Sequence, residues 1–220
     1  LALVYAEDMF QDSGLSAAAL HRARSAWRGM RTEVIGGQLL DISLEAAGSE
    51  SVELANSVNR YKTAAYTIER PLHLGASIAG ASEELIAAFR GYGQDIGIAY
   101  QLRDDQLGVF GDPAVTGKPA GDDLREGKRT ELLALALRRA DESDPQAAAT
   151  LRKLIGHTSD PQELSRLAQI IADSGAPEEI ERRIASLTQS GLQHLRAARV
   201  DPAVTETLEQ LAIKATARHK

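Results

Sequence analysis

Helix-start signals recur through the second half of the chain. A proline follows aspartate or alanine at Asp144-Pro145, Asp160-Pro161, Ala176-Pro177 and Asp201-Pro202. Aspartate is a favoured N-cap and proline fits the first helical turn, so each pair predicts the start of a helix. Apolar residues then recur at spacings of three and four, as at Leu208 and Leu211. We therefore predict helices at 130–141, 145–156, 161–173, 177–198 and 202–217.

The first half of the chain is also predicted to be helical. Helices are expected at 1–11, 17–45, 52–79 and 83–107, with Ser16 and Ser82 as N-caps of the second and fourth. Pro71 lies inside the third, where the lost backbone hydrogen bond costs about 3 kcal/mol, so a kink near Thr67 is expected. Aromatic residues are only 4% of the chain and no long Val, Ile or Tyr run suggests a strand. The predicted fold class is all-α.

Composition excludes several classes of function. The 220 residues suffice for one large domain with a buried core. The absence of cysteine excludes a disulfide scaffold, thiolate metal sites and cysteine catalysis, and it fits a cytoplasmic protein. The net charge of -6 argues against nucleic acid or an anionic membrane as a partner. No apolar run is long enough for membrane insertion, and no signal peptide is evident.

The chain begins inside a predicted helix. Its first residues, LALVYAEDMF, have neither an N-cap nor an initiator methionine. We therefore expect that an N-terminal part of the protein precedes Leu1.

Two adjacent carboxylates lie near the end of the fourth predicted helix. Gln101, Asp104 and Asp105 are at positions i, i+3 and i+4, so they project from one face. The negative end of a helix disfavours carboxylates by roughly 0.3–1 kcal/mol, and neighbouring acids repel each other. A divalent cation would remove both penalties, and carboxylate oxygens suit Mg2+. The alternative is that both acids are simply solvated.

A glycine-rich segment, predicted as a loop over 108–127, follows these acids. At about 20 residues it is longer than a passive connection, which makes it a candidate lid or binding loop. It is followed by Lys128 and contains Lys118, Asp122 and Asp123. A flexible cationic loop can close over a phosphate and exclude water. The alternative is a solvated charged loop.

Polar groups also interrupt the apolar faces of the second and third helices. Lys62 needs either an internal acid or an anionic ligand, and the Thr63 hydroxyl can bond the same ligand. Gly36-Gly37 lies inside the second helix, where each glycine costs about 1 kcal/mol relative to alanine. Either helix packing or another close approach explains the pair, and Gln38 and Asp41 can line the same cavity.

Four motifs together resemble one known family. GQLLD, YKTAAYTIERPLHLGASIAG, YQLRDDQLGVFGD and GKPAGDDLREGKRT, in this order, resemble trans-isoprenyl diphosphate synthases, the polyprenyl synthetases. The segment 93–130 is most similar to actinobacterial geranylgeranyl diphosphate synthases. The resemblance implies an isoprenoid synthase-type helical bundle around a central cavity, and usually a homodimer. It implies a single helical domain over 1–220, with a motif-bearing catalytic part at 1–137 and a C-terminal scaffold at 138–220.

The implied activity is that of a Mg2+-dependent prenyltransferase. Such enzymes join an allylic diphosphate to isopentenyl diphosphate by ionisation, condensation and proton loss. By resemblance, Asp104 and Asp105 would bind Mg2+, and Lys62 and Lys118 would contact the allylic diphosphate. Thr63 and Gln101 would orient that diphosphate, Gln38 and Asp41 would lie opposite it, and Lys128 would close with the loop. Product length, in the range from geranyl to geranylgeranyl, stays open.

The sequence departs from the family pattern in two places. The second aspartate-rich motif usually reads DDxxD, but its fifth position here is Gly108, and Asp112 is the candidate for the third acid. The first aspartate-rich motif is expected upstream of Leu1, so the 220 residues alone are expected to be inactive.

Two other readings remain. One is a non-catalytic regulatory subunit of a prenyl diphosphate synthase. The other is a class I terpene cyclase, whose metal motifs fit Lys62-Thr63 and GKPAGDD less well.

Overall fold

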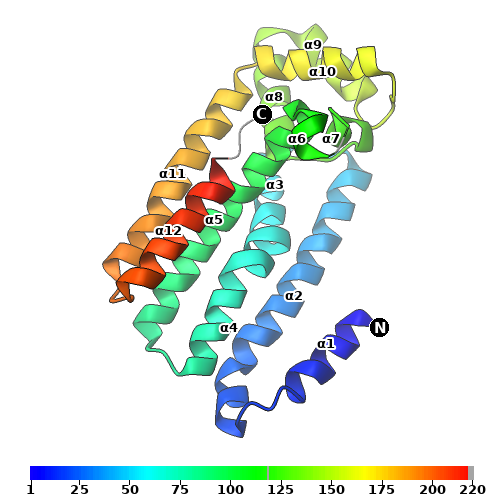
Figure 1. Ribbon diagram of the computed structural model, residues 1–220. Helices are drawn as coiled ribbons and strands as arrows, with labels where there is room; N and C mark the ends of the chain where they lie inside the picture. Colours follow the sequence, from blue (N-terminus) through cyan, green and yellow to red (C-terminus); the bar gives the residue numbers. More distant parts are fainter. Residues whose placement is uncertain (118, 218–220) are drawn as a thin grey trace.

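The computed structural model describes residues 1–117 and 119–217, without the side chains of Val115 and Thr116. Throughout this described part the chain is helical and contains no strand, which confirms the predicted all-α fold. Figure 1 shows the long helices running side by side as a bundle: α2 (Ala17–Ala47), α5 (Glu83–Phe110), α11 (Ala176–Ala197) and α12 (Pro202–Thr216). Two shorter helices, α9 (Pro145–Leu154) and α10 (Pro161–Asp173), lie across one end of the bundle (Figure 1).

Helix α5 is the central element of the bundle. It packs against α11 on one side and against the residues around Lys62 on the other. Its buried residue Leu102 belongs to a large apolar cluster shared with α8 (Glu131–Ser143), α9, α10 and α11. Burying each such side chain contributes about 1.5–3 kcal/mol, so the cluster fixes α5 firmly. A smaller cluster around Tyr92 and Leu195 joins the other end of α5 to α11 and α12.

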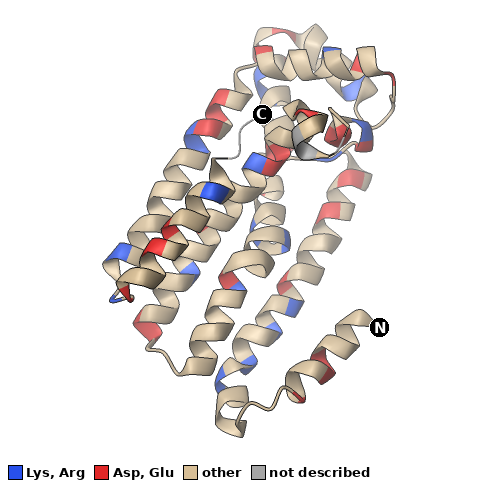
Figure 2. Cartoon of the chain, viewed as in Figure 1, with Lys and Arg blue, Asp and Glu red and all other residues tan. Residues whose placement is uncertain are grey.

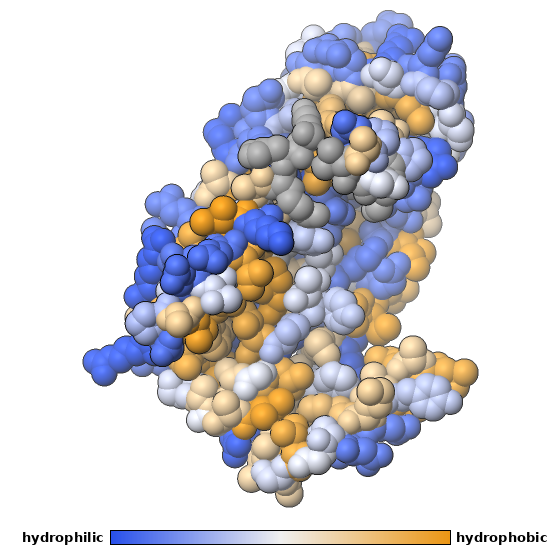
Figure 3. All heavy atoms as spheres, viewed as in Figure 1, coloured by the Kyte–Doolittle hydropathy of each residue, from blue (hydrophilic) through white to orange (hydrophobic). Residues whose placement is uncertain are grey.

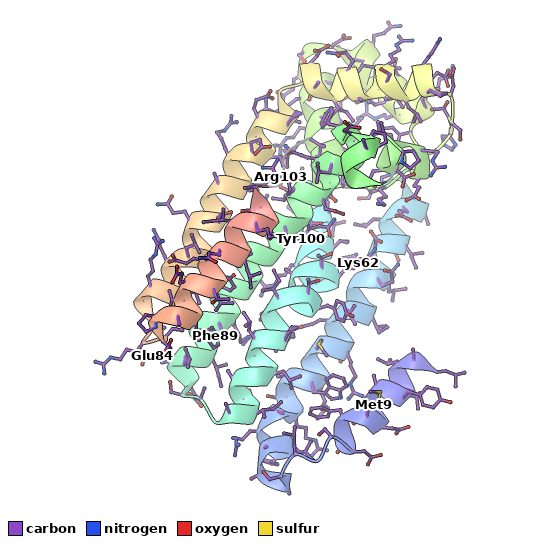
Figure 4. All side chains as sticks on the ribbon, viewed as in Figure 1. Met9, Lys62, Glu84, Phe89, Tyr100 and Arg103 are labelled. Atoms are coloured by element: carbon purple, nitrogen blue, oxygen red, sulfur yellow. The ribbon has the colours of Figure 1, made fainter. Side chains whose placement is uncertain are left out.

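Arg103 joins α5 to α11 and α12. Its guanidinium forms an ion pair with Glu181 on α11, and its Nε donates to the backbone carbonyl of Thr216 on α12 at 2.9 Å. Figure 4 shows Arg103 and Tyr100 on neighbouring turns of α5. These bonds hold α5 in place where it carries Asp104 and Asp105.

The predicted helix starts at Ser16, Ser82 and the three Asp-Pro pairs are borne out by side-chain caps, whereas the helix at Ala176-Pro177 begins after Gly175 without a side-chain cap. Ser16 and Ser82 accept hydrogen bonds from the backbone N–H groups of Ala19 and Leu85. Asp144, Asp160 and Asp201 cap α9, α10 and α12, each immediately before a proline. The boundaries differ from the predicted ones by only a few residues because capping chemistry is local.

The third predicted helix is different from the kinked α-helix that we expected. It consists of α3 (Val52–Val58), an 11-residue π-helix η1 (Asn59–Glu69) and α4 (Arg70–Ala79). Pro71 lies in the first turn of α4, where its missing N–H group costs the fewest helical hydrogen bonds. The interruption is therefore near the predicted position, but wide π-type winding replaces a kink.

Glycines on both neighbours make room for the wide η1. A Cβ at Gly37 of α2 would lie 2.4 Å from the backbone nitrogen of Lys62. On the other side, a Cβ at Gly93 of α5 would lie 2.4 Å from the Glu69 Cα. Backbone therefore packs on backbone at both contacts, which is the close approach that the Gly36-Gly37 pair predicted.

The prediction of a loop over 108–127 is wrong in two respects: the loop begins later than predicted, and it contains helical structure. Helix α5 continues through Gly108 to Phe110, and two short helices follow, α6 (Pro113–Thr116) and α7 (Asp122–Glu126). Glycines with positive φ end these helices, at Gly117 and Gly127. Gly108 thus lies inside α5, and a Cβ there would meet a neighbouring side chain, which is described below.

Helix α1 (Ala2–Gln11) is attached only lightly to the bundle. It buries none of its residues, and Phe10 stacks on Trp27 of α2 with ring centroids 4.6 Å apart. Met9 is 74% exposed, and apolar atoms of α1 are visible on the surface in Figure 3. Among the described helices, none has the length and apolar character that crossing a membrane requires.

Candidate active site

Six of the predicted site residues line one cavity. Its volume is about 80 Å3, and it lies where α2, η1, α5 and the segment before α8 meet. The six are Asp41, Lys62, Thr63, Gln101, Asp105 and Lys128. They come from sites up to 87 positions apart in the sequence, between Asp41 and Lys128, so the fold itself assembles them.

Asp105 is the buried acid of this cavity. Its side chain is 4% exposed, and its Oδ1 accepts a hydrogen bond from Gln101 Nε2 at 2.7 Å. Its Oδ2 has no hydrogen-bond partner. Burial raises the pKa of Asp105 well above its usual value, and the negative charges of Asp123 and Asp104 raise it further. A buried carboxylate oxygen without a partner is costly unless a cation or donor meets it.

A hydrogen-bond chain orients Asp105. Thr63 Oγ1 donates to Gln101 Oε1 at 2.8 Å, and the amide nitrogen of Gln101 donates to Asp105. Both polar atoms of the Gln101 amide are therefore used, which fixes its rotamer. Within this series of hydrogen bonds, Asp105 Oδ2 is the atom left available to a ligand.

Lys62 is held by an acid on the neighbouring helix. Its Nζ forms an ion pair with Asp41 Oδ2, and the side chains are 35% and 23% exposed. Figure 4 shows Lys62 between η1 and α2. Of the two sequence-based alternatives for Lys62, the structure shows pairing with an acid. Both groups retain access to solvent, so the pair can exchange for an anion.

Lys128 is paired with Asp123. Its Nζ bonds to Asp123 Oδ1, and Glu126 Oε2 lies 3.8 Å from the same nitrogen. Burial alone would lower the pKa of Lys128, but the hydrogen bond and charge of Asp123 raise it above its usual value. Lys128 is therefore a firm cation at neutral pH.

Two further cavity residues were not predicted. Asn59 Nδ2 and Arg129 Nε are buried N–H donors without a hydrogen-bond partner, and both residues line the cavity. Together with Asp105 Oδ2 they leave two donors and one acceptor unsatisfied around a small polar space. Such groups normally bind ordered water or a ligand. Asn59 lies outside the four motifs and Arg129 lies inside GKPAGDDLREGKRT, but neither was singled out there, because only the fold shows that their donors are unsatisfied.

Three of the predicted residues that the structure describes lie outside this cavity. Gln38 is exposed on α2, and Asp104 is half-buried on α5 without lining the cavity. Asp112 is exposed and caps α6, accepting from the backbone N–H of Ala114 at 2.8 Å. Lys118 lies outside the described residues. The hypothesis that Asp112 supplies a third metal ligand gains no support from this position.

Charge is arranged by helix around the site. Figure 2 shows acidic residues on the C-terminal part of α2, whereas its N-terminal part carries basic ones. Burial, followed by the negative charge of Asp41, raises the pKa of Glu45 one turn further along α2. Acids on α2 and α5 thus flank the cations Lys62 and Lys128.

The acids fit a divalent cation that shares its ligands with phosphate and water. Within the described part of the chain, no three acidic or histidine side chains are grouped closely enough to hold a metal ion alone. Mg2+ is commonly held by one or two carboxylates together with substrate phosphates and waters. The unpartnered Asp105 Oδ2 supplies one such carboxylate oxygen in the cavity, and Asp104, next to it in the sequence, lies outside the cavity lining.

The described residues thus form an all-α bundle with a cavity that is lined by a buried carboxylate and two paired lysines. The chain belongs to the polyprenyl synthetase family, whose model matches residues 13–173. This confirms the family resemblance that the sequence motifs suggested.

Particular members of the family are similar to the chain. A Corynebacterium glutamicum geranylgeranyl pyrophosphate synthase, solved with isoprenyl diphosphate and magnesium, is 64% identical with a TM-score of 0.97 over 99% of this chain and 61% of that one. A geranylfarnesyl diphosphate synthase of Aeropyrum pernix is 40% identical over 58% of this chain and 40% of its own length. A Mycobacterium tuberculosis geranylgeranyl diphosphate synthase is 39% identical over 51% and 32%, respectively. The predicted similarity to actinobacterial enzymes is confirmed, and the chain spans less than two thirds of each relative.

Proposed function

We propose that the protein is a chain-elongating prenyltransferase that condenses an allylic diphosphate with isopentenyl diphosphate. The observation that carries the proposal is the buried, unpartnered Oδ2 of Asp105, which faces a cavity flanked by Lys62 and Lys128. A buried acid beside two cations suits a metal-bound diphosphate better than it suits any uncharged substrate. Family membership supports the same reaction class.

The reaction follows the family pattern. The allylic carbon–oxygen bond breaks and both electrons leave with the diphosphate. The double bond of isopentenyl diphosphate then forms a new carbon–carbon bond to the allylic carbon. A proton is lost to the departing diphosphate, so no protein base is required. Bound Mg2+ would neutralise the charge that develops on the leaving group.

The residues of this chain divide the work by position. Asp104 and Asp105 on α5 would hold Mg2+, with Asp105 oriented by Gln101. Lys62 would leave Asp41 for a phosphate oxygen when the allylic diphosphate enters, and Lys128 would neutralise the same anion. Thr63 and Gln101 would place neutral oxygen atoms near the developing carbocation. Lys118 would contribute the further phosphate contact that the motif implies.

The proposal extends to the setting of the reaction. The products are prenyl diphosphates in the farnesyl to geranylgeranyl range, a range supported by the names of the similar enzymes. We also propose a homodimer and a cytoplasmic location, both from the family resemblance.

The test is product formation by the natural full-length protein. Farnesyl diphosphate, isopentenyl diphosphate and Mg2+ are incubated with the protein, and the products are separated by chain length. A longer prenyl diphosphate that requires Mg2+ is the expected result. Absence of any longer product with geranyl or farnesyl diphosphate would refute the proposal. Cyclised hydrocarbon would instead support a terpene cyclase.

A further inference from the structure

The side-chain position of residue 108 is occupied by another residue's carboxylate. A Cβ built on Gly108 would lie 2.1 Å from Asp123 Oδ2 and 2.3 Å from its Cγ. Asp123, on α7, is 6% exposed. Gly108 is the fifth position of the second aspartate-rich motif, which begins at Asp104, and the family usually has an acid there. The missing side chain therefore leaves a space that a carboxylate from α7 fills.

A second observation points to a ligand at Asp105, three positions before Gly108 on α5. Asp105 Oδ2 is buried, lines the cavity and has no hydrogen-bond partner. The Asp123 carboxylate lies against Gly108, three positions after Asp105 on α5, and both acids are buried. Two buried acids at neighbouring turns of α5, one with an unsatisfied oxygen, are expected to bind a cation.

We propose that Asp123 supplies the third carboxylate of the metal-binding face in place of the acid missing at position 108. The inference rests on the proposed function of the site. It replaces Asp112 in this role, because Asp112 is exposed and caps α6. The third acid thus comes from α7 and not from α5. Because Lys128 pairs with Asp123, a cation that takes over Asp123 also releases Lys128 toward phosphate.

The carboxylates do not have to form a closed protein cage. Among the described residues no three acids are grouped tightly enough for that. Mg2+ usually keeps several waters, so Asp123 can act directly or through a metal-bound water. Partners of metal-bound groups typically change affinity by about 10–100-fold when they are removed.

The test exchanges the two positions. Mg2+ binding to the full-length protein is measured by calorimetry, first with Mg2+ alone and then with inorganic pyrophosphate present. The variants are Asp123→Asn, Gly108→Asp and the double variant Gly108→Asp/Asp123→Gly. Asp122→Asn is the matched control, since this neighbouring acid on α7 pairs with Arg125. Circular dichroism checks the fold of each variant.

We expect Asp123→Asn to weaken Mg2+ binding about 10–100-fold and Asp122→Asn to leave it within about threefold. Gly108→Asp alone should disturb the site, because its Cβ would collide with Asp123. The double variant should restore binding to within about threefold of the natural protein, since the carboxylate returns to the same space. The inference is overturned if the double variant binds Mg2+ no better than Asp123→Asn does. This criterion also applies if Asp123→Asn itself misfolds.

Two further variants separate the possible reasons for a loss. If Asp123 acts only by holding Lys128, Lys128→Met must weaken the binding of Mg2+ alone as much as Asp123→Asn does, which contradicts the inference. We expect Lys128→Met to leave the binding of Mg2+ alone unchanged or stronger. Asp105→Asn tests the site itself. Normal binding in Asp105→Asn refutes the proposed function, whereas a loss there with normal binding in Asp123→Asn refutes only the role of Asp123.

Discussion

Asp105 destabilises the folded protein but serves its proposed function. Its ionised form is buried without a full set of partners, and its pKa is raised by burial and by neighbouring acids. A raised carboxyl pKa stabilises the fold at low pH, and that stability is lost as the pH rises through the folded-state pKa. Without Mg2+ at neutral pH, the Asp105 carboxylate therefore destabilises the protein.

We predict that Asp105→Asn lowers turnover by at least about 100-fold and raises the melting temperature measured without Mg2+. The amide removes the buried charge, but it is a poor ligand for Mg2+. Prenyl transfer assays and thermal unfolding in a chelator measure the two effects. Glu84→Gln, an exposed acid at the other end of α5 (Figure 4), is the control and should change neither. Wild-type turnover in Asp105→Asn would contradict the assignment.

Glu131 is a second buried acid, away from the reaction. It is fully buried at the start of α8, its Oε1 pairs with Arg183, and its Oε2 has no partner. Burial raises the pKa of Glu131 to about 7, from 4.5, against the opposing charge of Arg183. The contribution of Glu131 to stability is therefore complete below pH 4.5 and is lost as the pH rises through about 7.

We predict that Glu131→Gln makes the free energy of unfolding less dependent on pH between about 4.5 and 7. Each unit between the two pKa values corresponds to about 1.4 kcal/mol, which limits the effect to about 3 kcal/mol. Urea unfolding at several pH values measures the change in slope. Glu142→Gln, on the exposed face of the same helix, should leave the slope unchanged. An unaltered slope in Glu131→Gln would show that Glu131 does not titrate in this range.

Helix η1 shows which features of an element the sequence can predict. Pro71 correctly predicted an interruption of the helix, because a proline lacks the backbone N–H group wherever it lies. The π-type winding of η1 could not be predicted, since it depends on close contact with Gly37 and Gly93 on two other helices. The end of α5 was also missed, because a glycine at position 108 predicts a break from local sequence, whereas the helix continues to Phe110.

We predict that Gly37→Ala destabilises the protein and weakens pyrophosphate binding. The added methyl would lie 2.4 Å from the backbone nitrogen of Lys62. Helix η1 must therefore move and carry Lys62 away from the cavity. Overpacking of this kind typically costs about 1–3 kcal/mol. The adjacent Gly36→Ala is the control, because nothing lies within 4 Å of its Cβ, and it should be neutral or stabilising by up to about 1 kcal/mol. Thermal unfolding and calorimetry with Mg2+ and pyrophosphate compare the two variants, and equal effects would contradict the packing argument.

Assembly of the bundle converts separate motifs into one site. Caps and apolar spacing predicted most helices because those signals act within a few residues. The motifs also predicted six cavity residues, from Asp41 to Lys128, since the family resemblance carries their arrangement. Asn59 and Arg129 were not predicted, because their role depends on which side chains surround them in the assembled bundle.

Because the site joins α2, η1, α5 and the segment before α8, a ligand bound there should stabilise the entire bundle. We predict that Mg2+ and pyrophosphate together raise the melting temperature more than the sum of their separate effects. Alone, Mg2+ must compete with the ion pair between Lys128 and Asp123, and pyrophosphate must face the charge of Asp105. At about 100 times the dissociation constant a ligand adds about 2.7 kcal/mol, equivalent to roughly 5–10 °C for a domain of this size.

Thermal unfolding of the full-length protein with each ligand and with both measures this coupling. Asp105→Asn should remove the extra rise that appears with both ligands, because an amide at this position would hold Mg2+ only weakly. Arg152→Gln is the control for general destabilisation. Arg152 bridges Glu50 and Asp141 on the surface, so its loss should lower every melting temperature slightly and leave the extra rise unchanged. Strictly additive shifts in the natural protein would mean that metal and pyrophosphate bind at separate places, and the acids of α5 would then not face the lysines across one ligand.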